Sequence, residues 1–119
     1  MTILHITSRA EWQAAEERGE YSASSLVREG FIHCSTLEQV LPVASAFYRG
    51  QSGLVLLVVD EALVKPEVRW EAPAGPPAQG ITTSDLFPHI YGPLNVEAVV
   101  RVIDFPPDPA GGFSLPPLG

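Results

Sequence analysis

Three histidines, each followed two positions later by a hydroxyl residue, are the side chains in this sequence best suited to chemistry. The pairs are His5 with Thr7, His33 with Ser35, and His89 with Tyr91. Histidine is the side chain whose unperturbed pKa lies closest to neutrality, so it serves as both proton donor and acceptor. Side chains two positions apart along a strand share a face. If all three segments are strands, we predict that the three imidazoles lie around a single cavity.

Two other interpretations of the histidines remain open. In the first, each is an ordinary half-buried residue whose ring bonds a backbone carbonyl. In the second, the three rings converge on a zinc ion about 2.1 Å from each nitrogen, although no local ligand spacing supports such a site. A cleft for an organic ligand leaves a gap between the rings, and this is the arrangement that we predict.

Four other residues near these histidines carry reactive or polar groups. Cys34 follows His33 directly, and adjacent strand residues point to opposite faces, so we predict a core cysteine and not a nucleophile. Glu71 offers a carboxylate for general-base catalysis or for binding a ribose hydroxyl. Ser35 and Thr36 stand where a strand passes into a helix, and they either cap that helix or surround an anionic group. Capping is the favoured interpretation for Thr36.

The elements that must position these residues follow from hydrophobic periodicity. Alternating or continuous apolar sequence predicts strands over 3–7, 31–35, 54–59, 68–71, 88–91 and 96–105, and the start of the last segment is also compatible with a short helical turn. Helical spacing predicts helices over 10–18 and 37–48. Ser8 and Glu11 have the spacing of a capping box, and Gly19 is a natural stop for the first helix. This order predicts an α+β fold with two helices and a mostly antiparallel sheet.

Proline and glycine mark the remaining segments. The stretch 72–86 has no periodicity, and we predict a semi-rigid flap that borders the cleft between Glu71 and His89, the alternative being a solvent loop that touches no pocket. Residues 1–105 are predicted to form a single α+β domain. Residues 106–119 are rich in proline and glycine and are expected to be an extended or disordered tail.

Composition excludes several classes of function. The chain has 119 residues and a net charge of −7, which disfavours general binding to nucleic acids or to an anionic membrane surface. The longest apolar run, 54–59, is six residues long, whereas a membrane-spanning helix needs about 20. A lone cysteine and the absence of an export signal predict a cytoplasmic protein. A small anionic ligand remains compatible with this charge.

Several phrases of the sequence resemble a bacterial family known as domain of unknown function 952. They are Leu4 to Thr7, Gly30 to Thr36, Leu54 to Asp60, Arg69 to Glu71 and Phe87 to Leu94. The resemblance spans about Ile3 to Phe105. It implies an ADP-ribosyltransferase-like fold, in which a split, mostly antiparallel sheet holds nicotinamide adenine dinucleotide (NAD) in its cleft.

The resemblance also implies roles for individual residues. In that fold a histidine or arginine on the first strand holds the ribose, and His5 matches this position. A hydroxyl residue on a later strand braces the cleft, as Ser35 and Thr36 would. The third position falls either to Glu71 or to His89 and Tyr91.

These implications define the expected function. We expect ADP-ribosyl transfer or NAD glycohydrolase-type cleavage at the nicotinamide ribose bond, with NAD as ligand or substrate and no metal ligand. Its catalytic residues would be His5 and Glu71. Its dinucleotide-binding residues would be His33, Ser35, Thr36, His89 and Tyr91. The alternatives are a non-catalytic module that binds a nucleotide or another small ligand and, third, a three-histidine zinc hydrolase.

Overall fold

Eight strands, three α-helices and two short 3-10 helices make up the described part of the chain, which is residues 1–73, 75–82 and 85–118 of the computed structural model. In chain order these elements are β1 (Thr2–Ser8), α1 (Arg9–Arg18), β2 (Glu20–Tyr21), α2 (Ser24–Arg28), β3 (Ile32–His33), α3 (Val40–Phe47), β4 (Leu54–Asp60), η1 (Glu61–Leu63), β5 (Glu67–Glu71), β6 (Phe87–Tyr91), β7 (Leu94–Asn95), η2 (Val96–Ala98) and β8 (Val99–Asp104). Of the helices in these residues, none combines the length and the apolar character needed to cross a bilayer.

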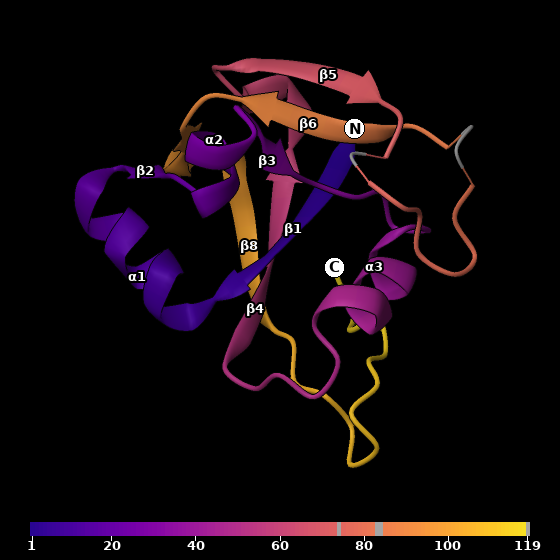
Figure 1. Cartoon of the computed structure of the whole chain (residues 1–119). Coiled ribbons are helices and arrows are strands. Elements are labelled where there is room, and N and C mark those ends of the chain that lie inside the picture. The colour runs from indigo at the N-terminus through magenta and orange to yellow at the C-terminus, as the bar shows by residue number, and fades with distance from the viewer. Residues whose placement is uncertain (74, 83–84, 119) are drawn as a thin grey trace.

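The strands form two three-stranded sheets and one short two-stranded pair. Strand order is β1-β4-β8 in the first sheet and β3-β6-β5 in the second, while β2 pairs with β7. Every pairing is antiparallel. In Figure 1 the first sheet runs down the middle of the molecule, and the second lies across its upper end. The predicted α+β fold with mostly antiparallel sheets is confirmed.

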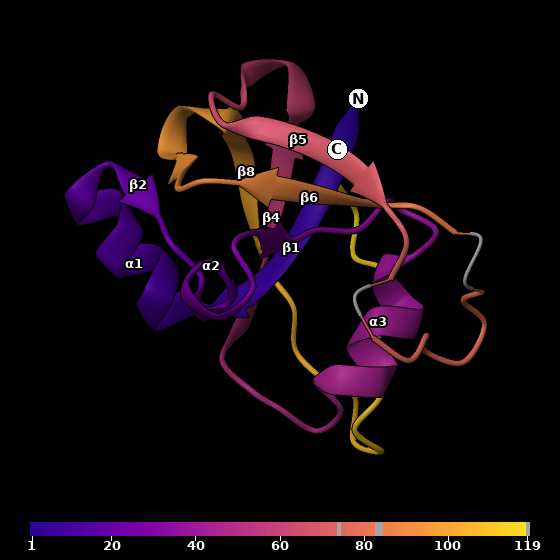
Figure 2. The same ribbon diagram turned by 45° about the horizontal axis from the view of Figure 1, so that its top comes forward.

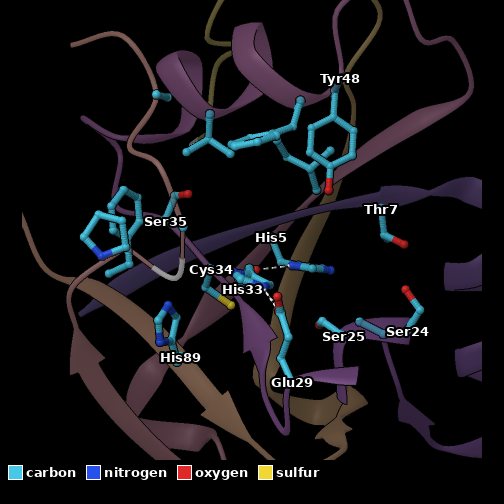
Figure 3. Close-up of a pocket in the computed structure, with 18 of the residues that line it drawn as sticks. His5, Thr7, Ser24, Ser25, Glu29, His33, Cys34, Ser35, Tyr48 and His89 are labelled. Carbon is cyan, nitrogen blue, oxygen red and sulfur yellow. Dashed lines mark hydrogen bonds and ion pairs between the residues drawn. The ribbon is translucent and has the colours of Figure 1, made fainter. Parts of the chain in front are cut away.

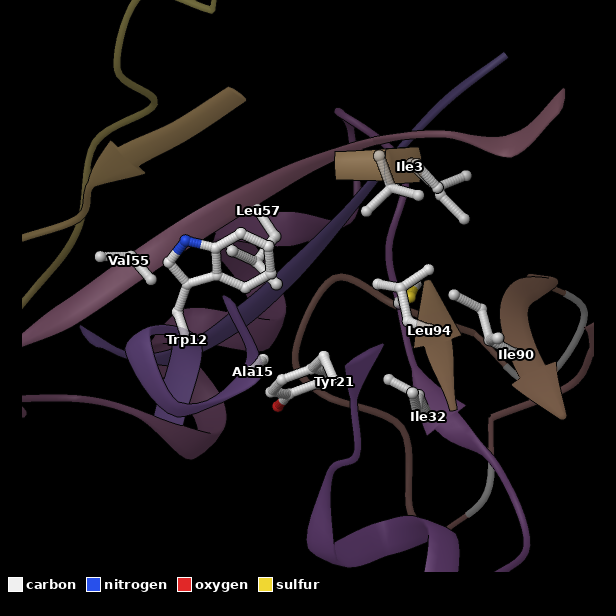
Figure 4. Close-up of a cluster of buried hydrophobic side chains, with 12 residues drawn as sticks. Ile3, Trp12, Ala15, Tyr21, Ile32, Val55, Leu57, Ile90 and Leu94 are labelled. Carbon is white, nitrogen blue, oxygen red and sulfur yellow. The ribbon is translucent and has the colours of Figure 1, made fainter. Parts of the chain in front are cut away.

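Strand β4 is the centre of the first sheet because it is apolar on both faces. Residues 54–59 are all buried, as expected for a strand between two partners. Val55, Leu57 and Val59 face a core that also holds Trp12 and Ala15 of α1, and Figure 4 shows these side chains with those of the second sheet. The alternate residues of β4 face another core, against α3. Each buried leucine or valine contributes roughly 1.5–3 kcal/mol, so β4 anchors both faces.

Helix α1 begins and ends where its predicted signals lie. The Glu11 backbone N–H donates to Ser8 Oγ at 3.1 Å, which caps the helix. Gly19 adopts φ 86°, a left-handed conformation that glycine accepts at little cost, and its N–H bonds the Ala15 carbonyl. The helix thus presents its apolar side to β4 and places Glu11 beside the end of β1.

The prediction of two helices was incomplete, because α2 was missed. It has five residues, no side-chain cap and only Ser25 buried, so it lacks the apolar periodicity that indicates a helix. Helix α3 begins at Val40, three residues later than predicted, and Pro42 therefore falls in its first turn. The missing N–H of proline costs nothing there, since the first N–H groups of a helix have no intrahelical partner.

One predicted strand is shorter than expected, and another opens with the helical turn that its sequence allowed. The segment 31–35 contributes only the two residues of β3 to a ladder, and its end forms a single bridge between Ser35 and Leu4. The segment 96–105 opens with η2 and becomes strand β8 afterwards.

The proline-rich tail packs on the domain although the described residues 106–118 contain no helix or strand. Phe113 stacks on Phe105 with ring centroids 4.8 Å apart. The Gly50 N–H donates to the Gly111 carbonyl at 2.9 Å, which ties the tail to the end of α3. Figures 1 and 2 both show the tail running beside α3. The tail therefore covers one of the two apolar cores and extends the packed structure beyond residue 105.

We expect Phe113→Ala to lower the free energy of unfolding by about 1–2 kcal/mol, because the ring is half-buried and fully buried phenylalanines lose more when truncated. Urea denaturation measures this change. Leu115→Ala is the matched control, since Leu115 is 42% exposed, and it should have little effect. Equal effects of the two substitutions would contradict a docked tail.

Candidate active site

A single bridge joins the two three-stranded sheets, and the sheets separate immediately beside it. The backbone groups of Leu4 and Ser35 exchange two hydrogen bonds of 2.8 Å. At the next residue of β1 the backbone hydrogen bonds between the sheets stop, and a side chain makes the contact. His5 Nδ1 lies 2.5 Å from the His33 carbonyl oxygen. A carbonyl only accepts hydrogen bonds, so Nδ1 carries the proton. The imidazole therefore takes the place of a backbone donor where the sheet splits.

A pocket of about 710 Å³ opens at this split, within the size range of small-ligand sites. His5, His33 and His89 all line it, and Figure 3 shows their side chains around the cavity. The prediction that the three histidines share one cavity is thus confirmed. Helix α2, the end of α3 and β1 supply further walls.

The segment between Glu71 and His89 borders the same pocket. Its lining residues are Pro73, Gly75, Pro76, Pro77, Ala78 and Ile81. Gln39 Nε2 donates to the Leu86 carbonyl at 2.7 Å and holds the end of this segment against the start of α3. The predicted position of the flap is confirmed for its described residues, while positions 74, 83 and 84 lie outside them.

His5 is buried and has a polar partner at each ring nitrogen, unlike a residue free to contact ligand. Its Nε2 lies 2.8 Å from Tyr21 Oη, and Tyr21 Oη lies 3.0 Å from Thr7 Oγ1. Thr7 in turn donates to Glu11 Oε2 at 3.0 Å. Burial lowers the pKa of His5 from 6.5 to about 4, against the opposing effect of the bond to the His33 carbonyl. The imidazole is therefore neutral at pH 7, and burial also raises the pKa of Tyr21.

His33 lies at the exposed side of the pocket and pairs with an acid that the sequence analysis missed. Its Nε2 contacts the Glu29 carboxylate, and both side chains are partly exposed. Its ring makes an edge contact with His89 at 5.5 Å between centroids. These contacts leave His33 and Glu29 accessible to a bound molecule.

His89 has the opposite environment, with a side chain only 3% exposed. Its Nδ1 lies 2.7 Å from Glu71 Oε1, and the Tyr91 hydroxyl donates to the same oxygen at 2.6 Å. Phe31 stacks on the His89 ring at 4.1 Å between centroids. Hydrogen bonds from Tyr91 and then from His89 lower the pKa of Glu71, so the carboxylate is ionised and accepts the Nδ1 proton.

This arrangement fixes both the orientation and the tautomer of His89. The Glu71 carboxylate only accepts hydrogen bonds, so Nδ1 carries a proton and Nε2 is the ring nitrogen left without a partner. Nε2 has no hydrogen-bond partner among the described residues, and it is not one of the fully buried polar atoms. His89 lines the pocket, so Nε2 is the ring nitrogen available to a bound molecule.

Three of the predicted site residues do not line the pocket. Glu71 lies on the edge strand β5, one strand further from the split than His89, and reaches the pocket only through that imidazole. Tyr91 of β6 contacts Glu71, and Arg69 Cζ lies over the Tyr91 ring, 4.4 Å from the ring centroid. The Thr36 N–H donates to Gln39 Oε1 at 2.9 Å, which is a local turn contact before α3. The expectation that Glu71 and His5 together face the ligand is not met by this geometry.

Ser35, which was predicted for the site, and Cys34, which was predicted for the core, both line the pocket. Ser35 is buried beside its backbone bridge to Leu4. Cys34 belongs to the apolar core, and burial raises the pKa of its thiol, so it remains protonated. The prediction of a core cysteine is confirmed.

The three imidazoles are separated by their individual partners and do not converge. The ring nitrogens of His5 bond a carbonyl and a phenol, while those of His33 and His89 contact different carboxylates. In the described part of the chain, no three histidine, cysteine, aspartate or glutamate side chains are grouped to hold a metal ion.

Five further titratable residues of the pocket were not assigned to the site by the sequence analysis. They are Glu11, Tyr21, Arg28, Glu29 and Tyr48. Tyr21 belongs to a two-residue strand and Glu29 follows a five-residue helix, so neither has a periodic pattern around it. Only Glu11 carried a signal, as the acid of the capping box, yet its carboxylate bonds Thr7.

We expect His5 to make folding sensitive to acid. The unfolded chain binds a proton at this residue near pH 6.5, whereas the folded chain does so only near pH 4. The stabilisation is therefore complete above pH 6.5 and is lost as the pH falls towards 4, by at most roughly 3 kcal/mol. Denaturation at several pH values should give a flatter dependence in His5→Gln than in the unmodified protein. A His5→Gln variant that keeps the full dependence would contradict this assignment.

The comparisons with known proteins agree with the resemblance seen in the sequence. Residues 6–102 match the family described as protein of unknown function (DUF952). The crystal structure of protein CC0527 from Caulobacter crescentus is 37% identical, with a TM-score of 0.83, and the match covers 97% of this chain and 95% of that one. Its solution NMR structure is 38% identical with a TM-score of 0.75, covering 93% and 90% of the two chains. A search of curated proteins found no match. The chain belongs to the DUF952 family.

Proposed function

We propose that this protein binds a nicotinamide dinucleotide in the pocket at the split and cleaves or transfers at its nicotinamide ribose bond. The observation that carries the proposal is the open Nε2 of His89, fixed by Glu71 in the wall of a pocket large enough for a ligand. The ADP-ribosyltransferase-like fold implied by the sequence resemblance is part of the same proposal. Two sheets joined by one bridge, with the pocket beside it, support that fold assignment.

His89 would act as the general base in this reaction. A water or another acceptor attacks C1′ of the nicotinamide ribose and transfers its proton to His89 Nε2. The C1′–N bond breaks, and its electron pair neutralises the positively charged pyridinium nitrogen, so nicotinamide leaves without needing a proton from an acid. Glu71 does not contact the substrate in this scheme. It is a positioning residue that holds the Nδ1 proton in place, as a carboxylate does for a histidine base elsewhere.

The charges of the pocket suit a transition state that gains positive charge at the ribose. Cleavage of a glycosidic bond has oxocarbenium character. Glu11 and Glu29 place carboxylates in the pocket wall and would stabilise that charge, and Arg28 supplies a cation for a phosphate group. His33 and Ser35 would contact the ribose or the ring, while His5 holds the wall in shape.

A non-catalytic nucleotide-binding module is the second candidate. It is favoured by the position of Glu71, whose carboxylate oxygen already accepts bonds from both His89 and Tyr91 and does not reach the pocket. In this case the same pocket binds the dinucleotide without turnover.

Incubation with oxidised NAD, with nicotinamide release followed by chromatography and binding by calorimetry, distinguishes these candidates. We expect release, with a rate about 10²–10⁴-fold lower in His89→Gln because a general base contributes about that factor. In Glu71→Gln the rate of nicotinamide release should also fall, but by less than in His89→Gln. Glu67→Gln is the matched control, since Glu67 lies on the same strand, is exposed and forms an ion pair with Arg69, and it should not change the rate.

The outcomes of this experiment separate the two candidates. Binding heat without nicotinamide release, unaffected by Glu71→Gln, would select the binding module. The absence of both binding heat and nicotinamide release would overturn both candidates.

A further inference from the structure

Four side chains of the pocket wall form a continuous hydrogen-bonded chain from the surface to the split. Glu11 is exposed at the start of α1, whereas Thr7, Tyr21 and His5 are buried. The three contacts of this chain measure 3.0 Å from Glu11 to Thr7, 3.0 Å from Thr7 to Tyr21, and 2.8 Å from Tyr21 to His5. All four residues line the pocket.

These three contacts contain too few protons when His5 is neutral and Glu11 is ionised. The Nδ1 proton of His5 is committed to the His33 carbonyl, so Nε2 only accepts. The carboxylate of Glu11 also only accepts. Thr7 and Tyr21 each supply one proton, which makes two protons for three contacts. One further proton completes the chain.

That proton completes the chain from either end. If it binds His5, then His5 donates to Tyr21, Tyr21 to Thr7 and Thr7 to Glu11. If it binds Glu11, every bond runs in the opposite direction. Between these two states one proton crosses each of the three contacts, which breaks one bond to hydrogen at each donor and forms one at each acceptor. The net result is the transfer of one proton from the carboxyl group to the imidazole.

We infer that Glu11, Thr7, Tyr21 and His5 form a proton path along which the exposed Glu11 controls the protonation of His5 in the pocket wall. This inference does not depend on the identity of the ligand. It makes Glu11 a positioning residue that acts on the pocket through two hydroxyl groups. The other titratable groups that act on these side chains are His33 on β3, Cys34 after it and Tyr48 after α3.

The first test is the titration of His5, followed through its ring nitrogens by NMR after ¹⁵N-histidine labelling. Glu11→Gln removes the charge, and Thr7→Val breaks the path while keeping that charge. Both should weaken proton binding by His5 about tenfold, because protonation then gains no additional hydrogen bond. Glu16→Gln, an exposed change on the same helix, should leave the titration unchanged. An unchanged His5 titration in Thr7→Val would reduce Glu11 to a distant charge and overturn the path.

The second test measures stability at pH 7 and does not require the protein to stay folded in acid. The side-chain amide that Glu11→Gln introduces donates a proton to Thr7, which satisfies all three contacts with His5 neutral. In a Thr7→Val background the same change adds no bond. We therefore expect Glu11→Gln to increase the folding equilibrium constant about fivefold more with Thr7 present than with Thr7→Val, which corresponds to one ordinary hydrogen bond. Effects on the helix terminus are the same in both backgrounds and cancel. Equal effects in the two backgrounds would overturn the proton count.

Discussion

The hydrogen bond from His5 Nδ1 to the His33 carbonyl is the interaction on which the pocket depends. It stands one residue beyond the Leu4–Ser35 bridge, where a continuing ladder would have closed the two sheets into one. An imidazole is larger than a backbone N–H, so the strands diverge while the carbonyl keeps its partner. Burial disfavours the protonated form of the ring, which lowers its pKa. The pocket thus exists because a side chain completes a backbone hydrogen bond.

The three histidines share a sequence pattern but have different surroundings. His5 is enclosed and bonded at both nitrogens, His33 is partly exposed beside Glu29, and His89 is buried with one nitrogen held by Glu71. A buried imidazole with one fixed partner keeps a ring nitrogen that can accept a proton. A buried imidazole with a partner at each nitrogen instead holds the neighbouring strands in place. The chemistry we propose therefore belongs to His89, and the shape of the site belongs to His5.

Local patterns predicted the parts of the fold that carry periodicity, including β4 between two partners, α1 with its Ser8 cap, and three histidines on strands around one cavity. Contacts between distant segments have no such signal. Glu71 meets His89 because Arg69 pairs with His89 across β5 and β6, and this register cannot be seen in either segment alone. The same holds for the stacking of Phe113 on Phe105, which makes a proline-rich tail part of the packed structure.

The central claim is that the pocket at the split receives a nicotinamide dinucleotide beside His89, and chemical-shift mapping of the labelled protein during titration with oxidised NAD tests it most directly. The account predicts saturable changes at the ring of His89 and at the backbone amides of His33, Ser35 and Ala78, with little change at Arg101 on the exposed part of β8. An absence of shifts, or shifts centred on β8, would contradict it.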